Sequence, residues 1–288
     1  AKETDAQLVM ASDPDADRVG AAVKNNEGEW VLLNGNQTAL MFVYYLITRW
    51  KELGKINGKE YIVKTIVTTE TIKTIAERNG VEMYDVYTGF KWIANVMREN
   101  EGKKNYIGGG EESYGFLCED FVRDKDAVSA CVILAEIAAW AKDQGLSLYQ
   151  LLQKIYVEYG FSKEKGISVV KKGKSGAEEI EAMMKKFREN PLTEIAGSKV
   201  TYFYDYSTLK GKDYAENETV TLDMPTTSNV LQYFTEDNTK VSIRPSGTEP
   251  KIKFYCEVHS KVKSIDELPE AEKAAEEKIN QIKASLGI

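Results

Sequence analysis

The sequence predicts an α/β domain over residues 34–163 and a smaller α+β domain over residues 164–288, preceded by a short segment, 1–33. Helix and strand patterns alternate from Asn34 onward, which is typical of a largely parallel sheet covered by helices. Beyond Gly160 the strict alternation is lost. Residues 1–33 are too few to fold alone, because so short a segment buries little apolar surface.

Apolar periodicity and turn residues give the elements of the first segment and of the α/β domain. Residues 8–10 and 18–23 are apolar enough for two strands, and residues 25–28 supply turn chemistry between them and the next domain. Gly54 and Gly80 each follow a helical pattern, where glycine commonly ends a helix. The expected order is helix 37–53, strand 61–68, helix 71–79, strand 82–87, helix 91–99, strand 106–107, helix 126–143 and helix 148–159.

The α+β domain is expected to hold short strands, one central helix and one terminal helix. The basic run at 171–176 is interpreted as a solvated turn rather than a binding patch. The expected order is strand 167–171, helix 177–189, strands near 200–205, 218–223, 229–234, 240–243 and 251–258, and a charged helix over 268–286.

The composition is that of an ordinary globular protein, with 42% hydrophobic and 29% charged residues among 288. A net charge of −7 disfavours a broad surface for nucleic acid or an anionic membrane. No apolar run approaches the roughly 20 residues that span a bilayer. The three cysteines form no C-x-x-C pair, so a zinc site or a disulfide framework is not indicated, and we expect a cytoplasmic protein.

Three carboxylates alternate directly after the first apolar run, at Asp13, Asp15 and Asp17. Such a loop suits Mg²⁺, which prefers oxygen ligands and keeps positions for water or a substrate phosphate. An EF-hand calcium loop would need Gly in place of Arg18 and Glu in place of Lys24. A solvated acidic turn is the remaining alternative for this segment.

A second polar segment follows the expected strand at 106–107 and begins with the three glycines 108–110. The glycines are expected to expose backbone amides and to allow a ligand to approach closely. Glu111 and Ser113, two residues apart, would point to one side of an extended segment and offer an acceptor and a hydroxyl to sugar hydroxyls. A flexible glycine hinge is the alternative interpretation.

A third segment lies between the expected strands 240–243 and 251–258. Arg244 supplies a bidentate fork, Ser246 and Thr248 supply hydroxyls, and Gly247 permits a nest of backbone amides, a combination suited to a phosphate. A simple hairpin turn is the alternative. Lys91 and Lys125 each stand in a short loop that is expected near the carboxyl ends of the parallel strands, where open α/β sheets bind ligands.

With these loops in this order, the chain resembles the α-D-phosphohexomutase family, the phosphoglucomutases and phosphomannomutases. The resemblance implies that residues 1–33 are the end of the family's domain 2, residues 34–163 its domain 3 and residues 164–288 its domain 4. The matching motifs are Asp13-Pro14-Asp15-Ala16-Asp17-Arg18, Gly110-Glu111-Glu112-Ser113-Tyr114-Gly115 and Arg244-Pro245-Ser246-Gly247-Thr248.

The resemblance also implies a role for each candidate residue. Mg²⁺ would bind Asp13, Asp15 and Asp17. Arg18 would lie close to the transferring phosphoryl group, with Lys91 and Lys125 as further basic groups of the catalytic centre. Glu111 and Ser113 would hold sugar hydroxyls, and the phosphate that is not transferred would contact Arg244, Ser246, Gly247 and Thr248. The implied substrate is a hexose phosphate, with glucose 1,6-bisphosphate as activator and intermediate.

One family feature is absent from the sequence. The family carries phosphate on a serine in a Ser-His-Asn-Pro type motif, whereas the only histidine here, His259, follows Val258 and precedes Ser260. We therefore expect that N-terminal domains of a longer polypeptide are missing, that this chain alone is inactive, and that His259 is structural or on the surface and not catalytic.

Three other functions stay open at this point. A phosphomannomutase or phosphopentomutase would share the same motifs, although the Glu-Glu-Ser-Tyr-Gly form looks more like phosphoglucomutases and phosphopentomutases. A sugar-phosphate-binding module without catalysis is a second alternative. A phosphatase of the haloacid dehalogenase type, with Asp13 as nucleophile, is a third, but it leaves the segments around Glu111 and Arg244 unexplained.

Overall fold

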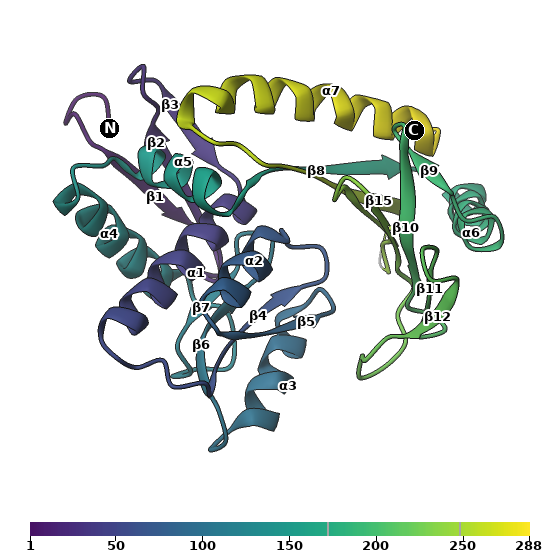
Figure 1. Ribbon diagram of the computed structural model, residues 1–288, viewed down its shortest axis with the longest axis horizontal. Coiled ribbons are helices and arrows are strands. Elements are labelled where there is room, and N and C mark those ends of the chain that lie inside the picture. Colours follow the sequence, from purple (N-terminus) through teal and green to yellow (C-terminus); the bar gives the residue numbers. More distant parts are fainter. Residues whose placement is uncertain (172, 248) are drawn as a thin grey trace. The chain divides into compact units, whose positions relative to one another are not determined.

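The computed structural model describes residues 1–171, 173–247 and 249–288. The chain forms two compact units, Ala1–Gly160 and Phe161–Ile288 (Figure 1). Residues 1–33, expected as a separate segment, group with residues 34–160 in the first unit. No helix among the described residues combines the length and apolar character needed to cross a membrane.

The first unit begins with a three-stranded antiparallel sheet in the order β1-β2-β3. Helix α4 packs against β1 and β2, and α5 packs against β2, so residues far along the chain complete the fold of residues 1–33. Helix α5 begins with a capping box between Ser147 and Gln150 and ends at Gly160, which has a positive φ. The bounds are Leu8–Ser12 for β1, Val19–Lys24 for β2, Trp30–Leu33 for β3, Ala127–Asp143 for α4 and Leu148–Tyr159 for α5.

The second sheet of this unit has the order β5-β4-β6-β7, with β4 parallel to β5 and β6, and β7 antiparallel to β6. Helices α1 and α3 pack against it and α2 packs against β5 and α1, which confirms the predicted α/β class. The bounds are Gly35–Glu52 for α1, Glu60–Thr65 for β4, Thr71–Arg78 for α2, Glu82–Val86 for β5, Phe90–Asn100 for α3, Asn105–Gly110 for β6 and Phe116–Cys118 for β7.

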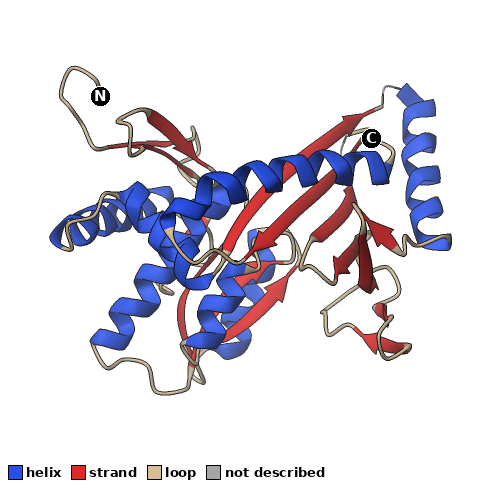
Figure 2. Cartoon of the chain, turned by 45° about the horizontal axis from the view of Figure 1, so that its top comes forward, coloured by secondary structure: helices blue, strands red, loops and turns tan. Residues whose placement is uncertain are grey.

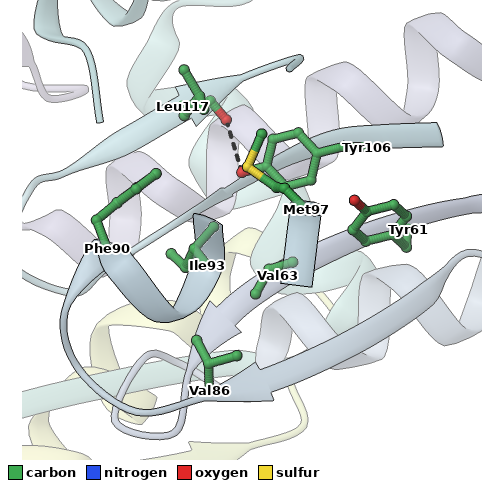
Figure 3. Close-up of a cluster of buried hydrophobic side chains, with 8 residues drawn as sticks. All are labelled: Tyr61, Val63, Val86, Phe90, Ile93, Met97, Tyr106 and Leu117. Carbon is green, nitrogen blue, oxygen red and sulfur yellow. Dashed lines mark hydrogen bonds between the residues drawn. The ribbon is translucent and has the colours of Figure 1, made fainter. Parts of the chain in front are cut away.

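A buried cluster joins α3 to this sheet (Figure 3). Apolar side chains of α3 meet those of β4, β6 and β7, and the Tyr106 hydroxyl donates to the Leu117 carbonyl at 3.4 Å. The eight residues are Tyr61, Val63, Val86, Phe90, Ile93, Met97, Tyr106 and Leu117. Burial of this apolar surface fixes the sheet, and with it the loops at the ends of its strands.

The three glycines of residues 108–110 correct the expectation of an exposed loop. They lie inside strand β6, are buried, and are paired on both sides by β4 and β7. A Cβ at Gly109 would lie 2.3 Å from the Val63 carbonyl oxygen, and one at Gly110 would lie 2.5 Å from a Phe116 ring carbon. The close approach that glycine permits here is therefore by neighbouring strands, not by a ligand.

The second unit is built on an antiparallel sheet in the order β12-β11-β10-β13-β14-β15-β8, with β9 paired to β10. Helix α7 lies along β15 and β8 (Figure 2), and α6 also contacts β15. The α+β character of this unit agrees with the prediction. The bounds are Phe161–Val170 for β8, Gly173–Glu189 for α6, Glu194–Ile195 for β9, Ser198–Asp205 for β10, Lys210–Asp213 for β11, Glu218–Thr221 for β12, Leu231–Thr235 for β13, Lys240–Pro245 for β14, Lys251–Ser260 for β15, Ile265–Glu267 for the 3₁₀ turn η1 and Leu268–Leu286 for α7.

Candidate functional site

The acidic segment forms the connection between β1 and β2, whose last and first residues, Ser12 and Val19, are paired. The loop closes around Asp13, because Asp13 Oδ1 accepts hydrogen bonds from the backbone N–H groups of Asp17 at 3.1 Å and Arg18 at 3.0 Å. Ala16 adopts φ 56°, which turns the chain sharply enough to bring the alternating acids together. The loop is thus an ordered turn with a carboxylate at its centre.

The three acids converge. Asp13, Asp15 and Asp17 can each offer a carboxylate oxygen such that all three atoms lie within 4.8 Å of one another. Burial raises the pKa of Asp13, but the backbone N–H groups of Arg18 and Asp17, together with Asp15 and the Arg18 charge, hold that pKa below its ordinary value. Asp13 is therefore held in its ionised form, and the cluster offers the hard carboxylate oxygens that a divalent cation prefers.

The environment of Asp17 indicates whether a cation fits among the three carboxylates. Asp17 Oδ1 is buried and has no hydrogen-bond partner in the described part of the chain; Arg18 Nε lies 3.8 Å from it, too far for a hydrogen bond. Asp17 Oδ2 pairs with Lys125 Nζ at 2.6 Å. A buried carboxylate oxygen without a donor is costly unless a cation or water satisfies it, so these residues fit a divalent metal.

The segment around Glu111 is a tight hairpin between β6 and β7. The Glu111 N–H donates to the Gly115 carbonyl at 2.9 Å, and Tyr114 adopts φ 72°. The expectation that Glu111 and Ser113 stand on an extended segment is therefore wrong, because the chain reverses between Glu111 and Gly115 and Ser113 lies within the turn. Gly35, at the start of α1, packs directly against the turn. A Cβ at this position would lie 2.1 Å from the Glu112 carbonyl oxygen.

Glu111 is 4% exposed and has a structural partner. Its Oε1 accepts the Gly89 N–H at 2.7 Å, at the start of α3. A carboxylate at a helix N-terminus is favoured by the helix dipole. Lys91, in the first turn of the same helix, is exposed, and its ammonium lies over the Trp92 ring at 4.9 Å. Glu111 thus connects the hairpin to the helix that carries Lys91.

Backbone contacts and Lys125 join the acidic loop to the hairpin. Arg18 forms a β-bridge with Gly115, and the Val19 N–H donates to the Tyr114 carbonyl at 3.2 Å. The Lys125 side chain, which pairs with Asp17, lies over Gly115, where a Cβ would be 2.5 Å from Lys125 Cδ. Burial lowers the pKa of Lys125, but Asp17 and Asp124 outweigh this and hold the pKa above its ordinary value.

Sequence reasoning missed a polar network at the end of β4. Thr65 Oγ1 donates to Glu112 Oε2 at 3.2 Å and lies 2.8 Å from Thr68 Oγ1. The buried Lys64 ammonium pairs with Glu70 at 2.9 Å and Asp85 at 2.7 Å. The repeated threonines after an apolar strand were the available signal, because hydroxyls at a strand end can reach a neighbouring loop.

The Arg244 segment belongs to the second unit. Arg244 and Pro245 lie in β14, Ser246 and Gly247 follow it, and Thr248 lies outside the described residues. The Ser246 N–H donates to the Lys251 carbonyl at 2.8 Å, which closes the turn.

Arg244 stands directly opposite Lys253 in the β14–β15 ladder. Within the described part of the chain, neither side chain has a hydrogen bond or ion pair. Like charges directly opposite each other destabilise a sheet, so this pair is suited to an anion that would neutralise both.

Two family models match most of the chain. The family model for phosphoglucomutase/phosphomannomutase alpha/beta/alpha domain III matches residues 34–159, and the model for the C-terminal domain of the same family matches residues 168–275. The chain belongs to the phosphoglucomutase/phosphomannomutase family. The two matches include the Glu111 hairpin and the Arg244 turn, each within its own model.

Relatives and solved structures are consistent with this family. A phosphoglucomutase of Staphylococcus aureus is 38% identical over 255 residues, which are 88% of this chain and 45% of that protein. The chain thus spans about half the length of the curated relatives it matches. A Burkholderia thailandensis phosphoglucomutase/phosphomannomutase family structure aligns with TM-score 0.60 and 18% identity, covering 99% of this chain and 48% of that one. Aspergillus fumigatus N-acetylphosphoglucosamine mutase, in complex with GlcNAc-6P and magnesium, aligns with TM-score 0.50 and 13% identity, covering 98% and 49%.

The structure brings together part of the candidate set. Asp13, Asp15, Asp17, Arg18, Lys125 and the Glu111–Gly115 hairpin are joined by the contacts above within the first unit. Lys91 is connected to them through α3 and the contact of Glu111 with Gly89. Arg244, Ser246 and Gly247 lie in the second unit, where this family's C-terminal domain model matches.

Proposed function

We propose that this chain supplies the metal, sugar and distal-phosphate segments of a phosphoglucomutase-type enzyme. The enzyme interconverts hexose 1-phosphate and hexose 6-phosphate through a phosphoserine and a 1,6-bisphosphate intermediate. The single observation that carries the proposal is the joined acidic loop and hairpin, in which Lys125 pairs with Asp17 while lying over Gly115. The 38% identity to a phosphoglucomutase supports glucose as the sugar.

Asp13, Asp15 and Asp17 would hold Mg²⁺, the ion present in the Aspergillus neighbour. When bound, the ion would neutralise charge that develops on phosphoryl oxygens. Arg18, which follows the last of these acids, would place a guanidinium beside the same phosphoryl group. Lys125 would add a second cation on the hairpin side of the loop.

The hairpin would orient the sugar. One Glu111 oxygen is committed to the Gly89 N–H, which leaves the other for a sugar hydroxyl. The half-buried Ser113 hydroxyl lies in the same turn. Orientation is the larger part of phosphoryl-transfer catalysis, because the transferring group needs little covalent help from the protein.

The second unit would bind the phosphate that is not transferred. This phosphate-binding site would consist of Arg244, Ser246, Gly247 and Thr248. Lys253 would contribute as well, because it is paired with Arg244 in the β14–β15 ladder. Because the intermediate carries two phosphates, a phosphate-binding site distinct from the metal site would let the enzyme hold one phosphate while it transfers the other.

The phosphoryl carrier is proposed to lie in a longer protein that contains this chain. We therefore expect no turnover of glucose 1-phosphate by the 288-residue chain with a trace of glucose 1,6-bisphosphate. A longer protein that adds a Ser-His-Asn-Pro segment should be active under the same conditions. Robust turnover by the chain alone would contradict the proposal, as would an inactive longer protein that binds Mg²⁺ normally.

A further inference from the structure

The ammonium of Lys125 lies between two carboxylates of unequal exposure. Its Nζ is 2.6 Å from Asp17 Oδ2 and 3.4 Å from Asp124 Oδ1. The Asp17 side chain is 23% exposed, whereas that of Asp124 is 71% exposed. The lysine therefore makes its shorter contact with the acid that belongs to the three-carboxylate cluster.

An ammonium and a divalent cation at Asp17 oppose each other. Each neutralises the same carboxylate, so the attraction that holds one is reduced when the other is present. The two cations also repel each other directly over the few ångströms of this loop. Metal binding therefore weakens the pairing of Lys125 with Asp17, and this pairing weakens metal binding to the same extent.

The backbone of Lys125 is fixed, so that only its side chain is free to change partner. The next residue, Asp126, caps α4 by accepting the Val128 and Ser129 N–H groups, and the Asp126 N–H donates to the Phe116 carbonyl at 3.1 Å. The methylene groups of Lys125 lie over Gly115. Rotation about the outer side-chain bonds would move the ammonium from Asp17 toward Asp124.

We propose that Lys125 is a positioning residue that exchanges with the metal at Asp17. Without metal, its ammonium holds the Asp17 carboxylate in the loop. When a divalent cation binds Asp13, Asp15 and Asp17, the ammonium leaves Asp17 for Asp124 and becomes available beside the hairpin. This inference rests on the proposed function for the identity of the metal site.

Metal affinity tests the exchange on the complete chain, without substrate. We expect Lys125→Met to bind Mn²⁺, followed by electron paramagnetic resonance, about 5-fold or more tightly than the unmodified chain. Lys125→Arg, which keeps the charge, should show no such gain. Arg123→Met is the matched control for long-range charge, because Arg123 is two residues away and pairs with Glu101 instead.

Amine reactivity gives a second readout on the unmodified chain. Acetylation of Lys125, followed by peptide mass spectrometry, should become faster when Mg²⁺ is added, while acetylation of Lys142 at the far end of α4 should not change. Equal or weaker Mn²⁺ binding by Lys125→Met, or a Lys125 reactivity that does not respond to Mg²⁺, overturns the exchange. Either of these two negative results would leave the proposed mutase function intact. Conversely, a longer enzyme that is inactive but shows the metal-dependent change at Lys125 would contradict the proposed function and not the exchange.

Discussion

Glu111 Oε1 accepts a hydrogen bond from the Gly89 backbone N–H at 2.7 Å, so a residue of the hairpin caps the helix that begins at Phe90. Glu111→Ala would leave the Gly89 donor unpaired and remove a charge from the helix N-terminus. We expect a loss of about 2 kcal/mol in the unfolding free energy, measured by urea denaturation. Glu111→Gln should recover part of it. The exposed Glu77→Gln on α2 is the control and should change stability by less than about 0.5 kcal/mol.

Gly35 is expected to be intolerant of any side chain. A Cβ would lie 2.1 Å from the Glu112 carbonyl oxygen, which is backbone and can move only with the whole hairpin. Gly35→Ala should therefore lower the unfolding free energy by about 1–3 kcal/mol. Gly20→Ala is the matched control, because its Cβ would meet only the Ala11 carbonyl oxygen, at 3.9 Å. Equal stability of the two variants would show that Gly35 does not support the turn.

Glu60 gives a pH dependence to the stability of the first unit. Its carboxylate accepts the N–H groups of Asn57, Gly58 and Lys59 and an amide N–H of Asn105. Burial raises the pKa of Glu60, but these donors outweigh it and hold the pKa below its ordinary value of 4.5. The unfolded chain thus binds this proton more readily than the folded chain does.

The resulting stabilisation is present above about pH 4.5 and is lost as the pH falls through the lower folded-state pKa. Glu60→Gln should be less stable than the unmodified chain at pH 7, and the difference should shrink in acid. Urea unfolding at several pH values measures both curves. A difference that is constant with pH would contradict the assigned cause.

Arg244 is expected to supply much of the affinity for a phosphate. Arg244→Ala should weaken binding of glucose 6-phosphate by about tenfold or more, because a charge-assisted pair is lost. Folding stability should be unchanged or slightly higher, since the like charge opposite Lys253 is removed. Calorimetry measures binding, and Lys261→Ala, just beyond β15, is the control. An unchanged affinity of Arg244→Ala for glucose 6-phosphate would show that Arg244 does not bind the phosphate.

The sequence was most informative where local chemistry decides the structure. The helix expected over residues 148–159 is α5, Leu148–Tyr159, because Ser147 caps its start and Gly160 ends it. The sequence predicts a loop at the glycines 108–110, whereas the structure has them in strand β6, because a glycine run carries no side-chain pattern. Their strand depends on pairing with β4 and β7, which lie elsewhere in the chain.

In the candidate site, too, local features could be predicted from the sequence and long-range contacts could not. The three acids of the acidic loop are close in sequence, so their convergence could be predicted from spacing. The pairing of Lys125 with Asp17 joins residues more than a hundred positions apart, and the Glu111 cap on α3 depends on the packing of β6 beside that helix. Such contacts follow from tertiary structure, which a local pattern does not contain.

Titration of the chain with Mg²⁺ in a calorimeter tests the central claim most directly, with Asp15→Asn as the comparison. Asp15 is exposed, so the substitution should leave thermal unfolding unchanged while removing one of the three convergent ligands. We expect one Mg²⁺ per chain in the unmodified protein and a loss of about tenfold or more in affinity in Asp15→Asn. No binding by the unmodified chain, or equal binding by both proteins, would contradict the assignment of Asp13, Asp15 and Asp17 as the metal ligands.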